Sequence, residues 1–357
     1  MRRTSKPSLS AIAKRSGVSL STVSRVINNS ADVSEELLNK VESVMKELGY
    51  PLSRNGSHGE NGVKGKMIGL LSDLGSDEMV RNEFQHRFLS GVEAAVSEGK
   101  GHLMFASCSE DLAKDELPAM VKDRLVSGVV LKISDSSNVR WLARLSQKIP
   151  VVLLMHSARG MDNICSVMCD NAGGMYQSLR YLYDLGHRRI GFLSIRDYTK
   201  GNFCPNLHNS QRLRAFMEFA PEFHLPENPA FIQNIRRDWE TKSLSEAVSE
   251  AMDAWLAMGE ERPTAVICAA DLYAFAFMEE ARKRCFSIPA DFSVTGFMNT
   301  VDCEHSQPPL TSISLQGEEV GRAAVELLDY QARHPDGPMR HLIVSSRLVE
   351  RVSCSRV

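Results

Sequence analysis

The apolar positions at the start of the chain recur at the spacing of two short helices. One stripe begins at Leu9 and the other at Val23, and Gly17-Val18 lies between them as a turn. Ser19 is a good N-cap for the second helix. The stripe residues are Leu9, Ile12 and Ala13, followed by Val23, Val26 and Ile27. Two short helices joined by a glycine turn are typical of a helix-turn-helix, although other helical hairpins contain the same turn.

A third helix is predicted after Ser34, which is placed to cap it, and Gly49 is expected to end it. Its apolar face consists of Leu37, Leu38, Val41, Val44, Met45 and Leu48. Residues 1–50 are therefore expected to form a three-helix headpiece. Residues 51–66 contain four glycines and few apolar residues, and we interpret them as a linker.

Beyond residue 66, short apolar runs alternate with helical stretches. The predicted strands are 67–71, 101–106, 126–131, 150–154, 163–167, 186–193, 230–234, 264–268, 292–297 and 340–350. The predicted helices are 81–98, 111–124, 138–147, 171–185, 209–219, 243–258, 271–284 and 317–334. This alternation predicts parallel α/β sheets. We expect residues 67–357 to form two doubly wound lobes. The lobes are expected at about 67–165 plus 298–330 and 166–297 plus 331–357. A cleft between such lobes binds small ligands.

The charge distribution favours a nucleic-acid partner for the headpiece. The whole chain has a net charge of -2, yet residues 1–31 contain no Asp or Glu. The basic residues in that segment are Arg2, Arg3, Lys6, Lys14, Arg15 and Arg25. A locally cationic face of this kind is typical of a phosphate-binding module.

Several other classes of protein are disfavoured by the sequence. No apolar stretch is long enough to cross a membrane, and the basic start lacks the apolar segment of a secretory signal, so we expect a cytoplasmic protein. None of the eight cysteines forms a C-x-x-C pair, and no metal site or cofactor is expected. The motifs G-x-S-x-G, G-x-x-x-x-G-K, H-E-x-x-H and G-x-G-x-x-G are absent, so we expect no enzyme. His187 lies in a turn beside two arginines and is not expected to be catalytic.

These motifs occur together in one known family. The headpiece contains Leu9-Ser-Ala-Ile-Ala, Ser16-Gly-Val-Ser, Thr22-Val-Ser-Arg-Val-Ile-Asn and Leu48-Gly-Tyr. The body contains Asp170-Asn, Leu185-Gly-His-Arg-Arg-Ile-Gly, Arg212-Leu-Arg-Ala-Phe, Ala270-Asp, Ser293-Val-Thr-Gly-Phe and Pro308-Pro-Leu-Thr. Over nearly its whole length the chain resembles the LacI/GalR family of bacterial transcription regulators. The resemblance implies a homodimeric DNA-binding repressor of the bacterial cytoplasm, associated with the nucleoid when it is bound to DNA. Its body would be similar to type I periplasmic binding proteins.

The resemblance also implies which headpiece residues meet double-stranded operator DNA, expected to be a pseudo-palindrome. Leu20 and Ser21 would read base edges, and Arg25 would contact a base or a nearby phosphate. The implied phosphate contacts are Ser8, Ser10, Ser19, Thr22 and Asn28. For Thr22 and Ser8, helix capping is the alternative role.

The linker departs from the family pattern. Members usually carry an Ala-Arg-x-Leu hinge helix whose Leu wedges into the minor groove. The corresponding place here is Arg54-Asn-Gly-Ser-His-Gly, with no Leu between Leu52 and Leu70. Because glycine disfavours a helix by about 1 kcal/mol per position, we expect no hinge helix and weaker DNA bending. Leu52 is an alternative wedge.

The effector site implied by the resemblance is also altered. Arg212 matches the family's ligand-binding arginine, while Met298 stands where members usually have an Asp that binds ligand hydroxyls. Asp271 matches a family Asp and is equally placed to cap the following helix. Asp73 follows the first strand, where members present a polar group, and a solvated turn carboxylate is its alternative role.

The effector is expected to be a small metabolite, such as a sugar or sugar derivative, bound between the lobes. Two alternatives stay open: a solute-binding protein without catalytic activity, and a regulator that has lost its effector response.

Overall fold

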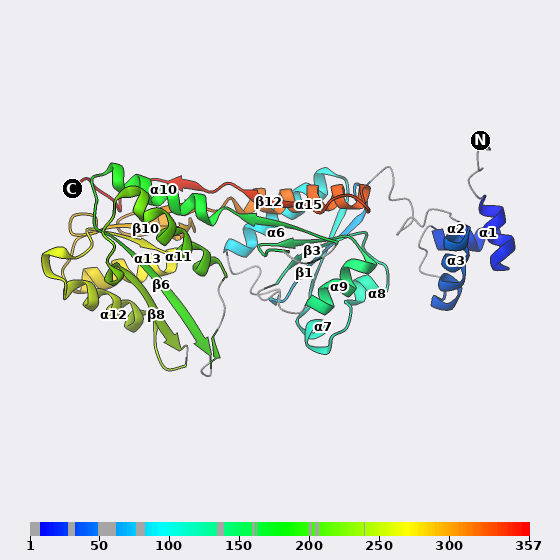
Figure 1. Cartoon of the computed structure of the whole chain (residues 1–357), viewed down its shortest axis with the longest axis horizontal. Coiled ribbons are helices and arrows are strands. Elements are labelled where there is room, and N and C mark those ends of the chain that lie inside the picture. Colours follow the sequence, from blue (N-terminus) through cyan, green and yellow to red (C-terminus); the bar gives the residue numbers. More distant parts are fainter. Residues whose placement is uncertain are drawn as a thin grey trace. The chain divides into compact units, whose positions relative to one another are not determined.

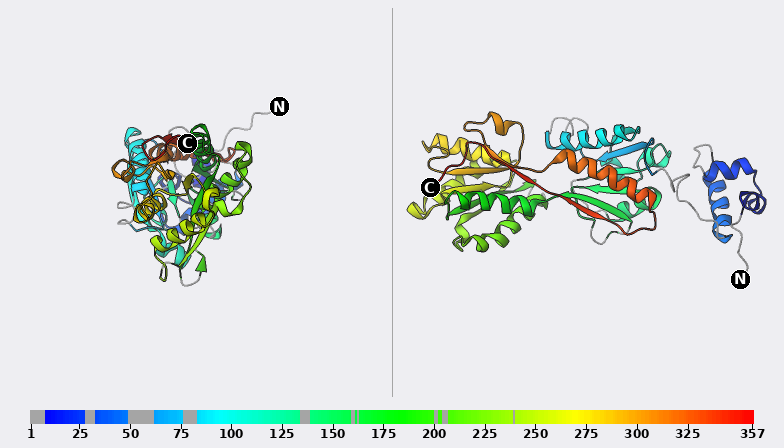
Figure 2. Two further views of the ribbon diagram at one scale, coloured as in Figure 1. Left: turned by 90° about the vertical axis from the view of Figure 1, so that its left-hand side faces the viewer. Right: turned by 90° about the horizontal axis from the view of Figure 1, so that it is seen from above.

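The computed structural model of the chain is shown in Figure 1 and Figure 2. It describes residues 8–27, 33–48, 62–75, 83–133, 139–158, 161, 163–199, 202–203, 207–238 and 240–357. The chain divides into two compact units. The first comprises Met1–Met168 and Glu318–Leu342, and the second comprises Cys169–Gly317 and Ile343–Val357. Helices lie on both faces of the sheet in each unit.

The headpiece contains the three predicted helices, α1 (Leu9–Ser16), α2 (Leu20–Ile27) and α3 (Glu35–Glu47). Ser34 caps α3 as predicted, because its side chain accepts a hydrogen bond from the backbone N–H of Leu37. The buried apolar side chains are Ile12, Ala13, Val23, Val26, Val41 and Met45. They come from the expected stripes, so the apolar spacing accounts for the packing of this module. Gly49, the expected C-cap, lies outside the described residues.

The first unit is built on a sheet with strand order β12-β5-β4-β3-β1-β2, in which β12 is His341–Val344. Neighbours among β1 to β5 run parallel. These strands are β1 (Met67–Ser72), β2 (His102–Ser107), β3 (Val129–Lys132), β4 (Val151–Leu154) and β5 (Ile164–Cys169). The helices are α6 (Glu83–Glu98), α7 (Ser109–Lys114), α8 (Ala119–Lys122), α9 (Val139–Lys148) and α15 (Gly317–Arg333). Strands β3 and β4 are buried along their whole length, as expected for a sheet covered by helices on both faces.

The second unit has strand order β13-β11-β10-β9-β6-β7, with β8 also paired to β6. Its strands are β6 (Ile190–Thr199), β7 (Asn202–Phe203), β8 (Ile232–Asp238), β9 (Ala265–Cys268), β10 (Ser293–Met298), β11 (Thr311–Ser314) and β13 (Arg347–Val349). Its helices include α10 (Asn171–Asp184), α11 (Leu207–Phe219), α12 (Leu244–Leu256), α13 (Asp271–Lys283) and α14 (Asp302–His305). The central pairs are parallel, so the predicted fold of two doubly wound lobes is confirmed.

Two predicted elements are divided in the structure. The helix expected at 111–124 is two short helices, α7 and α8, because Asp115 adopts a left-handed φ of 55° and Pro118 follows. The single C-terminal strand expected at 340–350 is β12 (His341–Val344) and β13, one in each sheet. Strand β11, which the apolar pattern did not indicate, lies between β10 and β13.

The boundaries of the two units also differ from the expected lobes. Residues 298–317 belong to the second unit rather than the first, because β11 pairs with β10 and β13 there. Residues 331–342 belong to the first unit, because α15 continues to Arg333 as one helix.

The described end of the predicted linker, residues 62–66, is attached to the first unit. Val63 is buried, and its N–H donates to Asp329 Oδ1 of α15 at 2.8 Å. Gly62 has a φ of 52°, and a Cβ there would collide with the Asp329 carboxylate. The linker is therefore anchored before β1 begins. Leu52 and the residues replacing the hinge lie outside the described part of the chain, so the absence of a hinge helix stays a prediction.

Candidate functional site

Helices α1 and α2 are held in a tight turn by glycine and serine. Gly17 adopts a φ of 70°, a left-handed conformation that glycine adopts without strain, and its N–H donates to the Ala13 carbonyl. Ser19 Oγ accepts from the N–H of Thr22 at 3.0 Å, which caps α2 as predicted. The turn fixes where α2 starts, and therefore which of its residues face outward.

One face of α2 is exposed and chemically suited to base edges. Leu20 is 54% exposed, whereas Val23 on the opposite face is fully buried. Ser21 and Arg25 are also exposed, and they are one helical turn apart. An exposed leucine, a hydroxyl and a guanidinium at the start of a helix match the side chains that recognition helices place in the major groove.

The hydroxyl groups around the start of α2 form a small network. Ser19 Oγ lies 2.7 Å from both Ser21 Oγ and Thr22 Oγ1. Thr22 is half-buried, so its side chain supports the turn as well as pointing toward the surface. This network orients the hydroxyls in the folded headpiece.

The remaining headpiece candidates have distinct surroundings. Ser8 caps α1, because its Oγ accepts from the N–H of Ala11 at 3.3 Å. Ser10 is exposed on α1. Asn28 lies outside the described residues. Ser8 therefore has a structural role, and a phosphate contact by its remaining acceptor capacity stays a prediction.

In the second unit, Arg212 of α11 is the centre of a buried polar cluster near the carboxyl ends of the parallel strands. Arg212 is 3% exposed. Its Nε donates to Asn171 Oδ1 at 2.8 Å and its Nη1 donates to the Ala269 carbonyl at 2.5 Å. The guanidinium also lies over the ring of Phe297, 4.4 Å from the centroid. Burial lowers the pKa of Arg212 to about 10.

The acceptors around Arg212 are neutral. Asn171 Nδ2 in turn donates to Gln211 Oε1 at 2.7 Å and lies 3.1 Å from His208 Nδ1. No carboxylate among the described residues forms a hydrogen bond or ion pair with Arg212, although the Asp271 carboxylate raises its pKa and so opposes the effect of burial. Since a buried guanidinium is stabilised by negative charge, the cluster is suited to a ligand that supplies acceptor oxygens.

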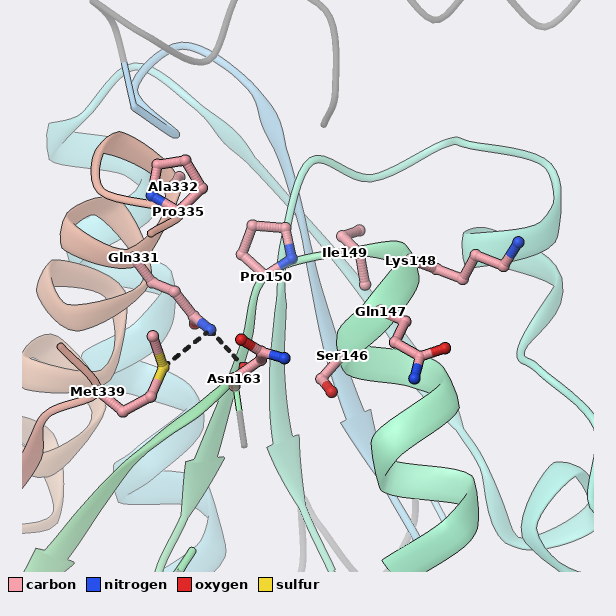
Figure 3. A pocket seen from close by; sticks show the side chains of 10 residues that line it. All are labelled: Ser146, Gln147, Lys148, Ile149, Pro150, Asn163, Gln331, Ala332, Pro335 and Met339. Atoms are coloured by element: carbon pink, nitrogen blue, oxygen red, sulfur yellow. Dashed lines mark hydrogen bonds between the residues drawn. The ribbon is translucent and has the colours of Figure 1, made fainter. Parts of the chain in front are cut away.

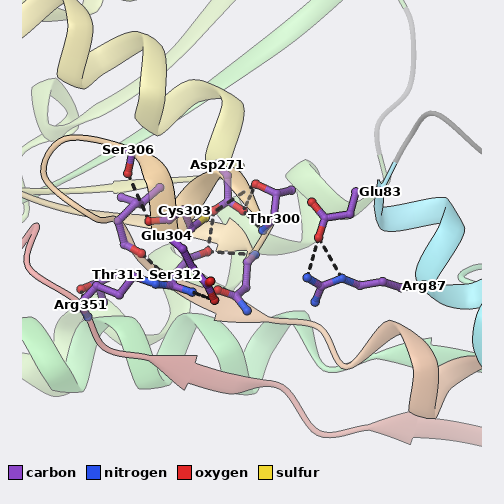
Figure 4. A network of polar contacts seen from close by, with 12 residues as sticks. Glu83, Arg87, Asp271, Thr300, Cys303, Glu304, Ser306, Thr311, Ser312 and Arg351 are labelled. Carbon is purple, nitrogen blue, oxygen red and sulfur yellow. Dashed lines mark hydrogen bonds and ion pairs between the residues drawn. The ribbon is translucent and has the colours of Figure 1, made fainter.

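The structure corrects the expected role of Asp271. Asp271 is the first residue of α13 and the N-cap position is Ala270, so Asp271 is not a helix cap. It is 1% exposed. Its Oδ1 accepts from Ser312 Oγ at 2.5 Å, and its Oδ2 accepts from the N–H of Thr300 at 2.9 Å (Figure 4). Burial raises the pKa of Asp271, against the opposing effect of these hydrogen bonds.

The Asp271 network determines the shape of the loop after β10, where the family usually has an Asp. Met298 and Asn299 adopt φ values of 113° and 51°. The N–H of Asn299 donates to Ser312 Oγ at 3.1 Å, so Ser312 connects this loop to Asp271. Two consecutive non-glycine residues in the left-handed region are strained, and this network holds them in place.

Some polar residues of this region were not singled out from the sequence. Asn171, His208 and Gln211 surround Arg212, and the Asp170-Asn motif was the only signal that pointed to one of them. Asn299 Oδ1 is buried and has no hydrogen-bond partner among the described residues. A buried acceptor without a partner costs about 1–3 kcal/mol, which makes Asn299 a further candidate for ligand contact.

Asp73 belongs to the first unit, whereas Arg212, Asp271 and Met298 belong to the second. Asp73 is half-buried at the end of β1, where its N–H donates to the Lys132 carbonyl at 3.2 Å. Its carbonyl accepts from Ser109 Oγ at 3.1 Å.

The Cys108 thiol is a neutral core group. Burial and the nearby Asp73 and Asp111 carboxylates raise its pKa to about 12.

His187, near the start of β6, is a structural residue. It is 1% exposed, and its ring nitrogens lie 2.8 Å from Thr264 Oγ1 and 2.9 Å from Ser293 Oγ. Burial lowers the pKa of His187 below its usual value. These contacts join the strand to its neighbours and leave no exposed nitrogen for chemistry.

The depressed pKa of His187 predicts a pH-dependent stability. The unfolded chain takes up a proton on this ring near pH 6.5, before the folded protein does, so this contribution is present above about pH 6.5 and is lost as pH falls. Below pH 6.5, the free energy of unfolding decreases by up to about 1.4 kcal/mol per pH unit. Urea unfolding of His187→Gln should show a smaller stability loss from pH 7.5 to 5.5 than the wild type. The exposed His224→Gln serves as the control, and equal losses in wild type and His187→Gln would contradict the assignment.

Two further properties of the described residues bear on function. No three His, Cys, Asp or Glu side chains in the described ranges lie together as a metal site would require. None of the helices in those ranges is long and apolar enough to cross a bilayer.

Two family models match the chain. The model described as "Bacterial regulatory proteins, lacI family" matches residues 8–52, and that described as "Periplasmic binding protein-like domain" matches residues 179–354. A helix-turn-helix head and two α/β units are the architecture of a DNA-binding transcription regulator. The chain therefore combines a LacI-family regulatory domain with a periplasmic-binding-protein-like domain, and its relatives are LacI-family regulators.

Named relatives are similar to the chain over nearly its full length. The HTH-type transcriptional regulator DegA of Bacillus subtilis is 25% identical, and the alignment covers 96% of this chain and 97% of that protein. The HTH-type transcriptional repressor PurR of Mannheimia succiniciproducens is 27% identical, with 97% and 98% covered. The solved structure of the Lac repressor dimer bound to operator and the anti-inducer ONPF has a TM-score of 0.62 at 20% identity and covers 98% of this chain and 100% of that chain. This last likeness supports the fold.

Proposed function

We propose that the chain is a sequence-specific repressor of transcription that reads a pseudo-palindromic operator with two copies of α2. The exposed face of α2 carries the proposal, because its opposite face is buried in the headpiece core. A helix held in this way presents the same side chains to the major groove in each head. The relative PurR of Mannheimia succiniciproducens is named a transcriptional repressor, which supports repression rather than activation.

The proposed contacts follow from exposure and chemistry. Leu20 and Ser21 meet base edges, and Arg25 donates to a guanine edge or to a phosphate. The proposed phosphate contacts are Ser8, Ser10, Ser19, Thr22 and Asn28. A homodimer is proposed, because a two-fold operator requires two heads. A DNA-binding role places the protein in the bacterial cytoplasm, and we propose no catalytic activity.

The proposed effector is a small metabolite with several acceptor oxygens, such as a sugar or sugar derivative, bound beside Arg212. The buried guanidinium, which has only neutral hydrogen-bond partners among the described residues, supports this chemistry. Met298 and Asn299 at the end of β10 are proposed further contacts in the same unit. Asp271 is proposed to act through Thr300 and Ser312, because both of its oxygens already accept hydrogen bonds.

A second candidate is a regulator without an effector response. It is favoured by Met298, a thioether in place of an acceptor carboxylate, and by the internal hydrogen bonds of Asp271. A thermal-shift screen with sugars, sugar acids and nucleosides separates the two candidates. A ligand at 100 times its dissociation constant stabilises the native state by about 2.7 kcal/mol. A shift that Arg212→Met abolishes supports the effector, and no shift with any compound supports the second candidate.

The DNA-binding proposal is tested by selection from a random double-stranded DNA library. We expect enrichment of a two-fold symmetric sequence that binds the full-length protein in fluorescence anisotropy. Because basic side chains displace counterions from phosphates, affinity should fall by on the order of 10³ between 50 and 200 mM salt. Absence of an enriched sequence, or binding that does not change with salt, would refute the proposal.

A further inference from the structure

Exposure decides which of the bonded polar side chains can also meet a ligand. In the hollow at the ends of α9 and α15, Gln331 is only 5% exposed and donates to the Asn163 carbonyl at 2.7 Å, so it stabilises the fold (Figure 3). At the start of α2, by contrast, Ser19 and Ser21 are both exposed, and their hydroxyl oxygens lie 2.7 Å apart. The hydrogen bonds at this end of α2 therefore determine which groups its surface can offer to DNA.

The hydrogen-bonding capacity of the Ser19 hydroxyl is fully used within the headpiece. A serine hydroxyl has one hydrogen to donate and two lone pairs that accept. Ser19 Oγ accepts from the N–H of Thr22 at 3.0 Å, and it lies 2.7 Å from the hydroxyl oxygens of both Ser21 and Thr22. One lone pair and one hydrogen thus remain for two hydroxyl neighbours. Ser19 must donate to one of them and accept from the other.

The hydroxyl groups of Ser21 and Thr22 are therefore not equivalent. The one that donates to Ser19 has only lone pairs left, whereas the one that accepts from Ser19 keeps its own hydrogen for a ligand. In the part of the headpiece that the structure describes, neither Ser21 Oγ nor Thr22 Oγ1 has another hydrogen-bond partner. The network leaves a single hydroxyl hydrogen for DNA.

A phosphate contact decides which residue keeps that hydrogen. Phosphate oxygens only accept hydrogen bonds, so the phosphate contact proposed for Thr22 requires the hydrogen of its hydroxyl. Thr22 Oγ1 then accepts from Ser19, which has only a lone pair left for Ser21. The hydrogen of Ser21 is thus donated to Ser19. Ser19 itself can still meet a phosphate through its backbone N–H, as residues at helix N-termini do.

We propose that Ser21 meets the major groove only as a hydrogen-bond acceptor, and that the base it contacts presents an amino group. Adenine N6 and cytosine N4 are the donors in the major groove, whereas guanine and thymine present acceptors there. The proposal rests on the proposed DNA-binding function. It makes Ser21 a specificity-determining residue, although a serine hydroxyl outside such a network pairs with donors and acceptors alike.

Base analogues in the selected operator test which group Ser21 contacts. The base pair is located as the position at which Ser21→Ala changes the sequence preference. At that pair in both half-sites, one operator lacks the amino group, with unsubstituted purine replacing adenine or 2-pyrimidinone replacing cytosine. Another operator lacks the acceptor N7, with 7-deazaadenine or 7-deazaguanine as the purine. In fluorescence anisotropy, loss of the amino group should weaken binding of the wild type at least about fivefold more than binding of Ser21→Ala. Loss of N7 should weaken both proteins equally.

A second test releases the hydrogen of Ser21. Ser19→Gly removes the hydroxyl that holds this hydrogen, and glycine is a tolerated N-cap residue. The released hydroxyl can also donate, so the preference for the selected base pair over the reversed pair should fall at least about threefold. Ser34→Gly removes the cap of α3, which is not part of this network, and should keep the wild-type preference.

Three results would overturn the proposal: no base pair whose preference depends on Ser21, equal effects of amino-group loss on wild type and Ser21→Ala, or an effect of N7 that depends on Ser21. An unchanged preference in a folded Ser19→Gly would also overturn it, and if Ser19→Gly does not fold, the analogues decide. Absence of any enriched sequence refutes the DNA-binding proposal together with this one. An operator that is bound without the expected dependence on Ser21 refutes this one alone.

Discussion

Replacing Arg25 with alanine is expected to remove specific operator binding while the headpiece stays folded. Arg25 is exposed on α2 and is not part of the hydrophobic cluster of the headpiece. An arginine that contacts a base contributes about 1–3 kcal/mol per site. Because a dimer carries two heads, the affinity for the selected operator should fall between roughly 30-fold and 10⁴-fold.

The control for this prediction removes the same charge elsewhere in the headpiece. Lys46 is exposed on α3, so Lys46→Ala isolates the general loss of positive charge. We expect Arg25→Ala to weaken specific binding far more than Lys46→Ala, and both variants to keep the wild-type circular dichroism spectrum. Fluorescence anisotropy at fixed salt measures the difference. Operator affinity that is the same in both variants would show that Arg25 does not read the operator.

The headpiece was predictable because local signals determine it. The caps Ser19 and Ser34 and the apolar stripes act within a few residues of one another, and the structure contains the helices they indicate. The strands of the body were predictable for the same reason, since a run such as Val151–Leu154 is apolar throughout and buried on both faces. The predictions that were wrong concern where helices and strands end. Pro118 lies between the two short helices that replace one predicted helix, and Ser346 lies between β12 and β13, which belong to different sheets.

The buried polar cluster around Arg212 was less predictable from the sequence, because its contacts join distant parts of the chain. Arg212 was found through a motif, but its partners Asn171 and Ala269 lie about 40 and 60 residues away. The Ala270-Asp motif indicates that Asp271 contacts the ligand or caps the following helix. Its bonds to Thr300 and Ser312 depend on the pairing of β10 with β11, and β11 itself was missed. Sequence patterns therefore located the residues, and only the folded sheet assigned their roles.

The role of Asp271 gives the second large expected effect, a loss of stability in Asp271→Ala. The substitution leaves the N–H of Thr300 and the hydroxyl of Ser312 without their acceptor in a buried place. Hydrogen bonds to a charged group contribute about 1.5–3 kcal/mol each, and relief of the buried charge offsets part of this, so we expect a net loss of about 3 kcal/mol. For a unit of this size, that lowers the melting temperature by roughly 6–12 °C. Asp184→Ala, which removes an exposed carboxylate paired with Arg180, should cost less than about 1 kcal/mol.

The pH dependence distinguishes the buried carboxyl of Asp271 from a general packing defect. Because its folded pKa is raised, the carboxyl contributes stability that is fully present below the pKa of the unfolded chain and is lost as pH rises through the folded pKa. Asp271→Asn cannot ionise, so its stability relative to the wild type should improve as pH rises through that window. Calorimetric melting of wild type, Asp271→Asn and Asp184→Ala across that range measures this. A constant difference between wild type and Asp271→Asn would mean that this carboxyl has the same pKa in the folded and the unfolded chain, which would contradict a pKa raised by burial.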